Sequence, residues 1–595
     1  MKKYLTSAPG AYLVIVVLVL LAYGLVIENG YVWDDRYFLV DYTWIDTIPD
    51  AIKASLQPLF GQRAYVRPLA LFTLYLEAIA SGRNPAVSHA VNLLLHLLSS
   101  LLVYVIARRA WADSMQGRGG WVSLLAGALF AVHPALTENV AWISSRFDLL
   151  ATLFALAAIW LAGSRVADWP RAFGVAGLFF LAALCKESVA VLPAVLGGLA
   201  MFQAASLAGR PRLHLADAFT ARQLKLYLLL FAAGVAYLLV RHQVLSGAQL
   251  LQYAPASLEQ HLVWMGVSLY EYAKLTLIPF VGNSPHHSFL WHEGMGFGDY
   301  WQKASLGFAL LVLALGLAAG RRRAGWWLLL WLTCFLPVLH LIQLTIGGNI
   351  VHQRFMYLPT AVLIGFSPYA LVSLRLSEVG ARAAVAISWL LVALSVLVCN
   401  TIVPAWKNDM TLWKWTVAMD PGSVEARENL IWSYLEAGMF DEANEQMTFI
   451  REHGMRTTAT VAVNMGVAHY RRGEFEQADF YYEIARDASD TMPKDQQARL
   501  LSNMSINYAV QGKAGLAGKT IIDSLVLDPR NTMALSHLIG YCPGVELRLD
   551  EYKPEEVARA REGSNVTRQV VSERQPGLLK SLSLCPPAGG SNRWR

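Results

Sequence analysis

Long apolar runs recur through the first two thirds of the chain and stop near residue 404. Because a helix needs about 20 mostly apolar residues to cross a bilayer, about eleven of these runs are candidate membrane spans. Their approximate bounds are 11–28, 86–107, 121–135, 148–163, 171–185, 188–205, 224–240, 302–319, 325–345, 355–373 and 384–403. The pattern predicts an all-α, polytopic membrane domain over residues 1–404.

Two further apolar stretches are interpreted as lying along the membrane surface. Residues 66–79 follow an amphipathic segment at 48–60, and residues 261–280 carry Glu271 and Lys274 near their middle. If 258–281 crosses the membrane instead, another run must fail to cross.

Basic residues collect in alternate connections between the runs. Lys2 and Lys3 precede the first run, and the loops around Arg108, Arg210 and Arg321 lie on the same side if about eleven segments span. The positive-inside rule places that side in the cytoplasm. An odd number of spans then puts everything after residue 404 on the extracytoplasmic face. Basic N-terminus and compact loops together favour a bacterial inner (plasma) membrane, with the C-terminal region in the periplasm.

A helical repeat replaces the apolar runs after residue 404. Gly438, Gly473 and Gly512 are spaced 35 and 39 residues apart, and each is followed five residues later by an alanine. This spacing resembles the tetratricopeptide repeat, in which two helices pack closely around a glycine-containing turn. We expect such a domain over 405–544, either as a peptide-binding groove or as a packed structural cap. The polar tail, 545–595, is expected to be partly disordered.

Composition narrows the function. The chain has 595 residues, of which 55% are hydrophobic and 15% charged, and its formal charge of +6 is scattered. A membrane protein without a basic patch is expected to bind membrane lipids and no nucleic acid. The five cysteines show no metal-ligand spacing, so neither a metal nor another cofactor is expected.

Apart from the basic residues of the cytoplasmic loops, the charged and histidine residues that could carry chemistry fall on one predicted side, the extracytoplasmic one, with Arg67 before the surface stretch and His89 near the outer end of the second run. They occur in the first outer loop, in the loops at 133–148 and 186–187, and at the start of the tenth run. The candidates are Asp34, Asp35, Arg67, His89, His133, Glu138, Arg146, Asp148, Lys186, Glu187 and Arg354. Scattered structural charges are not expected to gather on one side.

Carboxylates beside arginine and lysine suit group transfer from a phosphate-linked donor. A carboxylate can accept the proton of an attacking hydroxyl, and cations can offset the charge of a phosphate leaving group. Nucleotides are not available outside the cytoplasm, and no phosphate-binding loop appears in the sequence. These constraints favour a lipid-phosphate donor reached from the bilayer.

Several ordered motifs carry a more specific resemblance. They are Trp33-Asp-Asp-Arg36, Tyr65-Val-Arg-Pro-Leu69, the segment from His89 to His96, the segment from His133 to Asp148, Lys186-Glu187 and Gln353-Arg-Phe-Met-Tyr-Leu-Pro359. The chain resembles the GT-C class of polyprenyl-phosphate-sugar glycosyltransferases. Within that class it is most similar to the membrane O-mannosyltransferases that carry tetratricopeptide repeats. More distantly, it resembles protein O-mannosyltransferases and lipid A aminoarabinose transferases.

The resemblance implies inverting transfer of one sugar from a polyprenyl-phosphate carrier to a Ser or Thr hydroxyl of a protein. It implies Asp34 as general base, with Asp35 orienting the acceptor or sharing that role, and Arg354 and Lys186 on the donor phosphate. The sugar or acceptor pocket would be formed by Arg67, His89, His133, Glu138, Arg146, Asp148 and Glu187. The chain departs from the family at Gln353, where an acidic residue is frequent, and at Ser144-Ser145, where glycine is common.

Other interpretations stay open at this point. The acceptor could be a lipid or a polysaccharide, and the chain could be a non-catalytic scaffold or transporter whose repeats recruit partners. Asp34-Asp35 could cap a loop helix, and the pairs Lys186-Glu187 and Arg146 with Asp148 could be structural. The identity of the sugar and the oligomeric state do not follow from the sequence.

Overall fold

The computed structural model describes residues 8–41, 44–59, 65–115, 120–246, 257–288, 297–341, 349–371, 377–541 and 554–574. These form two compact units, Met1–Ser423 and Val424–Arg595. The units divide 19 residues after the predicted domain boundary at 404. The segment that follows the last apolar run therefore belongs to the first unit.

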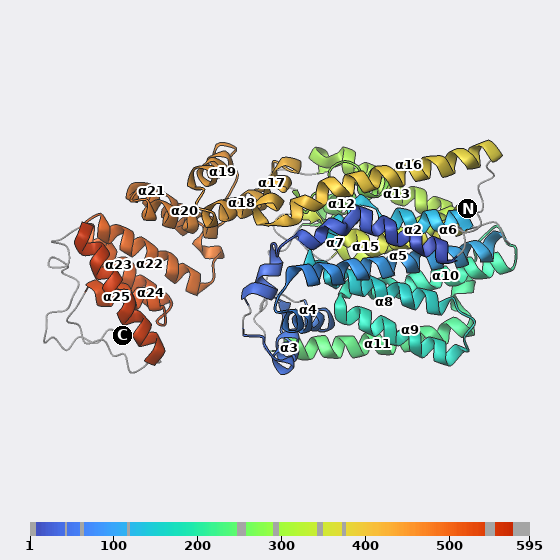
Figure 1. Cartoon of the computed structure of the whole chain (residues 1–595), viewed down its shortest axis with the longest axis horizontal. Helices are drawn as coiled ribbons and strands as arrows, with labels where there is room; N and C mark the ends of the chain where they lie inside the picture. Colours follow the sequence, from blue (N-terminus) through green and yellow to red (C-terminus); the bar gives the residue numbers. More distant parts are fainter. Residues whose placement is uncertain are drawn as a thin grey trace. The chain divides into compact units, whose positions relative to one another are not determined.

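The first unit is almost entirely helical (Figure 1). Its α-helices are α2 (Ala8–Tyr23), α3 (Ile48–Ser55), α4 (Pro68–Ser81), α5 (Pro85–Met115), α6 (Gly120–Ala131), α7 (Thr137–Ala141), α8 (Arg146–Ala162), α9 (Asp168–Cys185), α10 (Leu192–Leu207), α11 (Ala221–Leu245), α12 (Leu258–Leu277), α13 (Phe297–Ala319), α14 (Arg323–Thr333), α15 (Tyr357–Leu371), α16 (Glu378–Ile402) and α17 (Asp409–Met419). Short 3-10 turns connect several of them. Two short strands, β1 (His287–Ser288) and β2 (Asn349–Val351), pair antiparallel, with His287 opposite Val351.

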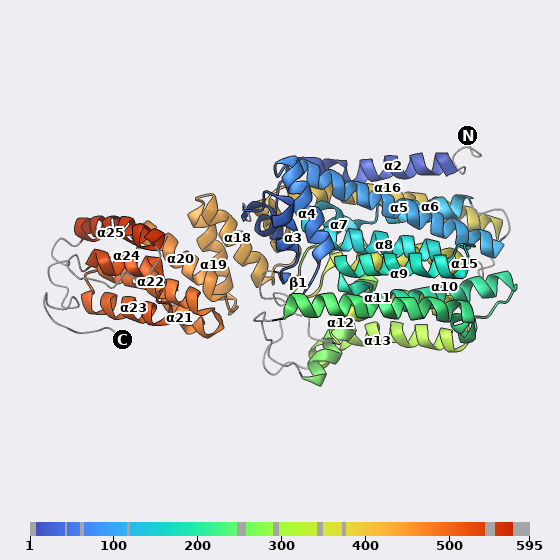
Figure 2. The ribbon, with the colours of Figure 1, turned by 90° about the horizontal axis from the view of Figure 1, so that it is seen from below.

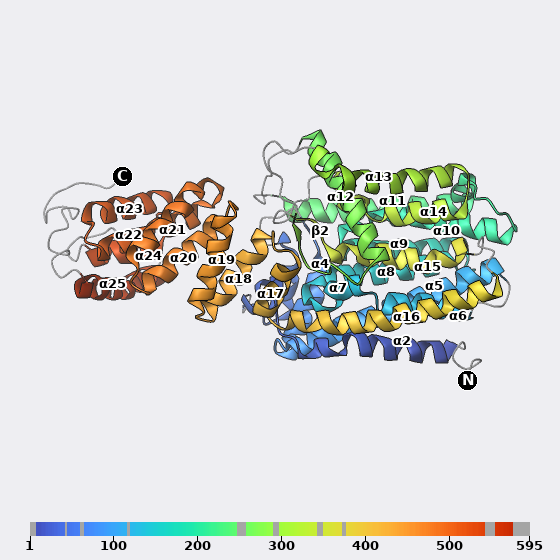
Figure 3. The same ribbon diagram turned by 90° about the horizontal axis from the view of Figure 1, so that it is seen from above.

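The long helices lie side by side in a bundle (Figures 2 and 3). Helix α5 packs on α8, α8 on α9, and α9 on α11. A second series runs from α12 through α13 and α14 to α15, which returns to pack on α5. Helices α2, α6 and α16 contact one another beside α5. Nearly every long helix therefore buries one side against a neighbour, and one hydrophobic core extends through the bundle.

Eight helical segments of the described residues are long and apolar enough to cross a membrane. They coincide with eight of the eleven predicted runs. A ninth run corresponds to the bent pair Gly120–Ala131 and Pro134–Ala141, which meet at 47°. The all-α, multi-pass membrane class predicted from the sequence is thereby confirmed.

The two predicted runs that remain, 325–345 and 355–373, contain shorter helices. Helix α14 has 11 residues and ends at Thr333, just before a turn at Leu336–Val338. Helix α15 has 15 residues and begins only after the 3-10 turn Gln353–Met356. At 1.5 Å per residue, 15 residues extend about 22 Å, short of the roughly 30 Å hydrocarbon core. The apolar runs predicted uninterrupted helices, whereas prolines and polar residues at their ends form turns. Neither surface stretch, α4 nor α12, is among the eight.

The second unit contains α18 (Val424–Glu436), α19 (Phe440–Glu452), α20 (Ala459–Arg471), α21 (Phe475–Asp487), α22 (Lys494–Val510), α23 (Ala514–Leu527), α24 (Thr532–Tyr541) and α25 (Pro554–Arg574). Consecutive helices pack in pairs, α18 on α19, α20 on α21, α22 on α23 and α24 on α25. Helix α25 lies within the tail, for which the sequence predicted no element.

Glycines close the turns inside the first three pairs. Gly438, Gly473 and Gly512 have φ angles of 73°, 79° and 78°, a left-handed conformation that only glycine adopts without strain. The repeat spacing thus predicted where each helix pair turns. The tetratricopeptide class of these pairs stays a prediction from the sequence.

Candidate active site

Asp34 and Asp35 lie at the start of a short helical segment that continues as the π-helix Arg36–Asp41. Two long-range hydrogen bonds hold the connection before it, called here the Asp34 loop, in place. The loop follows the 3-10 turn Gly24–Glu28, which extends the first span. The amide of Gly30 donates to the carbonyl of Lys407 (2.9 Å), and the side chain of Asn29 donates to the carbonyl of Val403 (3.2 Å). The end of the last span therefore fixes the entrance of the loop.

The carboxylate of Asp35 is fully buried and hydrogen-bonded on both oxygens. Its Oδ1 accepts from the amide of Ser144 at 2.7 Å and from the Ser144 hydroxyl at 2.5 Å, and its Oδ2 accepts from the amide of Val32 at 3.3 Å. Burial raises the pKa of Asp35 to about 7, although the hydrogen bonds from Ser144 act in the opposite direction. Asp35 thus anchors the loop and presents no open oxygen to a ligand.

Asp34 is only half-buried, and its neighbours are positioned by α17. The amide of Trp33, whose φ is 54°, donates to Oδ1 of Asp409 at 2.7 Å. The guanidinium of Arg36 forms an ion pair with Oδ2 of the same aspartate at 3.2 Å. A left-handed tryptophan is unusual, so the bond to Asp409 stabilises a strained residue directly before Asp34.

Aromatic rings surround this loop. The indole of Trp33 stacks on that of Trp142, with ring centres 4.8 Å apart and planes 19° apart. The rings of Trp413 and His286 each meet Trp33 edge-on, at 5.3 Å. These contacts bring together the loop that carries Trp33, the segment before α8, the β1 segment and α17.

Arg354 lies over the same aromatic cluster. Its guanidinium carbon is 5.6 Å from the ring centre of Trp33, 5.2 Å from that of Trp142 and 5.1 Å from that of Phe355. Glu138, fully buried, accepts from Nη1 of Arg354 and from its backbone amide, both at 3.0 Å. Within the described residues, the hydrogen bonds to Glu138 engage only one of the three guanidinium nitrogens.

Lys186, at the C-terminal end of α9, also contacts the phenyl ring of Phe355. Its ammonium nitrogen is 4.6 Å from the ring centre of Phe355 and donates to both oxygens of Asp148, at 2.5 and 2.6 Å. Both cations that were predicted to bind a donor phosphate therefore contact Phe355. Each is also paired with a carboxylate, so the resting site is close to charge-neutral.

Two further predicted cations, Arg67 and Arg146, are also paired with carboxylates. Arg67 donates to Glu187 at 3.0 and 3.4 Å. Arg146 is 1% exposed and donates to Glu77 at 2.5 Å, to Asn92 at 2.9 Å and to the carbonyl of Ser88 at 2.9 Å. The Arg146 contacts tie the start of α8 to α4 and α5. Arg146 and Asp148, whose pairing was left open, have different partners.

The two predicted histidines contact backbone carbonyls. His89 approaches the carbonyl of Gly30 at 3.4 Å, and His133 that of Thr276 at 3.3 Å. His89 connects α5 to the Asp34 loop. His133 connects the segment before α7 to α12. Among the described residues, no group of three or more His, Cys, Asp or Glu side chains could hold a metal ion.

Sequence reasoning missed several partners of this site. Asp409, Glu77 and Phe355 were not singled out, and Ser144 was noted only where glycine is common. Asp409 follows Asn408, which caps α17, so the pattern predicts the start of a helix. A local pattern cannot reveal a partner 376 positions away.

Known proteins of similar sequence carry names that agree with the family resemblance of the motifs. No protein-family model matches the chain. Protein O-mannosyl-transferase Tmtc1 of Drosophila melanogaster is 33% identical over 172 residues, which are 27% of this chain and 19% of that protein. Protein O-mannosyl-transferase TMTC1 of Homo sapiens is 32% identical over 148 residues (23% and 16%), and TMTC4 of Mus musculus is 37% identical over 139 residues (20% and 19%).

The chain spans less than a fifth of the length of these curated relatives. The matched names nevertheless agree with the resemblance drawn from the sequence motifs, which is confirmed at this level. Over about a quarter of its length, this multi-pass membrane chain is similar to the TMTC protein O-mannosyl-transferases.

Proposed function

We propose that the chain is a membrane glycosyltransferase that moves one sugar from a polyprenyl-phosphate carrier to a Ser or Thr hydroxyl of a protein. One observation carries the proposal. Trp33, which directly precedes Asp34, lies under the guanidinium of Arg354, and Arg354 and Lys186 share the ring of Phe355. A half-buried carboxylate and two cations thus belong to one aromatic-walled cluster.

Asp34 is the proposed general base. The acceptor hydroxyl oxygen attacks the anomeric carbon while Asp34 accepts its proton, and the bond between that carbon and the phosphate oxygen breaks. A single displacement inverts the anomeric carbon and releases polyprenyl phosphate. Asp35 supports this assignment because its own oxygens are buried and bonded to Ser144 and Val32. It positions the loop in this scheme.

Arg354 and Lys186 are the proposed partners of the leaving phosphate. Negative charge grows on that phosphate in the transition state, and donors that are already oriented stabilise it without reorganisation. Glu138 and Asp148 hold the two cations in place. No metal is required in this scheme, since the two cations offset the charge.

The site is proposed to face the extracytoplasmic side. The support is the distribution of basic residues, which favours a cytoplasmic N-terminus and extracytoplasmic helical pairs. The relatives named above are animal proteins, so the prediction of a bacterial inner membrane rests on the sequence alone. The repeat unit is a candidate docking domain for the protein acceptor.

A reconstitution experiment tests the function. Full-length protein in lipid vesicles is supplied with a radiolabelled polyprenyl-phosphate hexose or pentose and a mixture of secreted proteins. We expect label in protein, at Ser or Thr, together with release of polyprenyl phosphate. Label confined to lipid or polysaccharide identifies the alternative acceptor. Binding of proteins without transfer of any sugar indicates the scaffold instead.

A further inference from the structure

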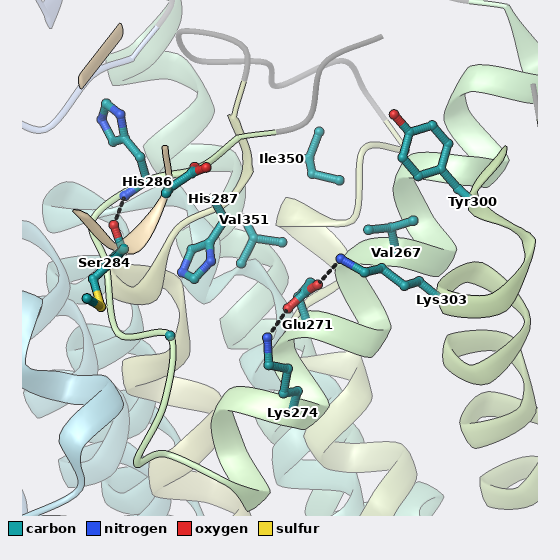
Figure 4. Close-up of a pocket in the computed structure, with 13 residues that line it drawn as sticks. Val267, Glu271, Lys274, Ser284, His286, His287, Tyr300, Lys303, Ile350 and Val351 are labelled. Atoms are coloured by element: carbon teal, nitrogen blue, oxygen red, sulfur yellow. Dashed lines mark hydrogen bonds and ion pairs between the residues drawn. The ribbon is translucent and has the colours of Figure 1, made fainter. Parts of the chain in front are cut away.

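A polar cavity of about 260 Å³ lies beside the candidate active site (Figure 4). It is enclosed by α12, the β1 and β2 segments, the start of α13 and the end of α17. The polar side chains that line it are Glu271, Lys274, Ser284, His286, His287, Tyr300, Lys303 and Asp420. None of these residues has a role in the proposed transfer step.

The cavity is balanced in charge. Glu271 accepts from Lys303 at 2.8 Å and from Lys274 at 3.2 Å, as the dashed lines in Figure 4 show. Two ammonium groups and the carboxylates of Glu271 and Asp420 give a formal sum of zero. Both lysines share the one carboxylate of Glu271, so an anionic ligand would have to compete with Glu271 for each of them. Arg354 differs, because its bond to Glu138 engages only one guanidinium nitrogen, so phosphate or carboxylate is less favoured in the cavity than at Arg354.

Apolar side chains line the cavity together with the polar ones. Val267, Ile350 and Val351 line the cavity beside the ion pairs. The Nε2 of His287 has no hydrogen-bond partner among the described residues. Burial lowers the pKa of His287, so its ring is neutral near pH 7 and can donate or accept one hydrogen bond.

A sugar ring matches these features. Each hydroxyl donates one hydrogen bond and accepts others, so a ring of hydroxyls can satisfy ammonium donors and carboxylate acceptors together. Its C–H faces suit the valine and isoleucine side chains. The volume is below the roughly 300–1,000 Å³ of drug-sized sites, which fits a single ring.

The cavity is also adjacent to the candidate base. His286, which lines it, meets the ring of Trp33 edge-on at 5.3 Å, and Asp34 is the next residue along the chain. We propose that this cavity is a carbohydrate subsite that binds one neutral sugar ring. The ring is either the sugar of the lipid-linked donor or a sugar already on the acceptor. The proposal rests on the proposed function, because it names the ligand of a pocket beside that site.

Saturation-transfer difference NMR on the full chain in nanodiscs tests it without any transfer reaction. The probe is a panel of methyl hexosides and methyl pentosides. Wild type is expected to give a saturation signal for at least one glycoside. Its binding should weaken about tenfold in both Glu271→Gln and His287→Ala, since the first replaces a charged acceptor oxygen by an amide donor and the second removes the imidazole ring. Glu378→Gln, at an exposed ion pair with Arg382, is the matched control and should bind as wild type.

A competition experiment distinguishes the two possible sources of the sugar ring, the donor and the acceptor. It also defines the outcomes that overturn the proposal. Displacement of the methyl glycoside by a short-chain polyprenyl-phosphate sugar assigns the cavity to the donor, and displacement by a glycosylated peptide assigns it to the acceptor. No saturation signal, signal unchanged in both cavity variants, or displacement by inorganic phosphate alone overturns the proposal. Sugar binding without any transfer activity would refute the proposed function while leaving the subsite intact. The two variants are compared only when their thermal unfolding matches wild type within a few degrees; His287→Ala serves alone if Glu271→Gln does not fold.

Discussion

Asp35 and Ser144 are 109 positions apart in the chain, yet two hydrogen bonds join them at one carboxylate oxygen. The amide and the hydroxyl of Ser144 converge on Oδ1 of Asp35, which lies in the interior. This contact fixes the loop that presents Asp34 against the segment that carries Trp142. The orientation of the candidate base therefore depends on the side chain of Ser144.

Removing the Ser144 hydroxyl tests that dependence. Ser144→Ala keeps the backbone amide donor but loses the hydroxyl donor, so we expect transfer to slow about tenfold, as one hydrogen bond to a charged group is worth about 1.5 kcal/mol. The Michaelis constant for the lipid donor should change little, because Ser144 does not touch it in the proposed scheme. Ser388→Ala, at an exposed position on α16, is the control. An unchanged rate in Ser144→Ala would show that the Ser144 hydroxyl does not help to position Asp34 for transfer.

The buried Asp35 predicts a pH dependence of stability. Its pKa is about 7 in the folded protein against 3.8 for the free side chain, so the folded state holds an extra proton between about pH 4 and pH 7. Stability from this group is complete below about pH 4 and is lost as pH rises through 7, by up to about 1.4 kcal/mol per pH unit. Thermal unfolding of wild type and Asp35→Asn across this range measures it. The difference between the two curves should not change with pH between 5 and 7 if Asp35 is already ionised at pH 5.

The ion pair between Lys186 and Asp148 predicts that removing one charge destabilises the protein more than removing both charges. Lys186→Met leaves a buried carboxylate without its cation, which typically costs about 3–5 kcal/mol. Lys186→Met with Asp148→Leu removes both charges and should recover much of that stability. It should not recover transfer, because the cation for the donor phosphate is gone. Recovery of both stability and transfer in the double variant would show that Lys186 has a structural role only.

Asp409 is a positioning residue in this account. Asp409→Ala removes the acceptor for the Trp33 amide and the partner of Arg36, whereas Asp409→Asn keeps an oxygen acceptor and loses the ion pair. We expect the turnover number to fall by about tenfold or more in Asp409→Ala and less in Asp409→Asn. Intrinsic tryptophan fluorescence of the Trp33 cluster should change in step with the rate. A stability loss with an unchanged rate would make Asp409 purely structural.

The apolar pattern predicted the membrane helices well because membrane insertion depends on local composition. The differences occur where turns interrupt an apolar run, as at Leu336–Val338 after α14 and at Gln353–Met356 before α15. The pattern also missed α25, whose sequence is polar and has no apolar run. Charged residues were predicted to gather on one side. The structure does bring Asp35, Arg354 and Lys186 into neighbouring contacts around Trp142 and Phe355.

Which charge meets which could not be predicted. Lys186 and Glu187 are adjacent in sequence, yet Lys186 pairs with Asp148 and Glu187 with Arg67. Arg146 pairs with Glu77, which no motif singled out. These partners are set by how helices pack and not by spacing along one helix. The roles of the site residues likewise stay predictions until substitution tests them.

The most direct measurement is the transfer rate of Asp34→Asn in vesicles, with a radiolabelled polyprenyl-phosphate sugar and the mixture of secreted proteins used in the reconstitution. Asp46→Asn, at an exposed aspartate paired with Arg83, is the matched control. Because a general base contributes about 10²–10⁴ in rate, the account predicts a loss of at least about a hundredfold in Asp34→Asn. Thermal unfolding and donor binding should be unchanged, and Asp46→Asn should retain the wild-type rate. Transfer by Asp34→Asn at the wild-type rate would contradict the account.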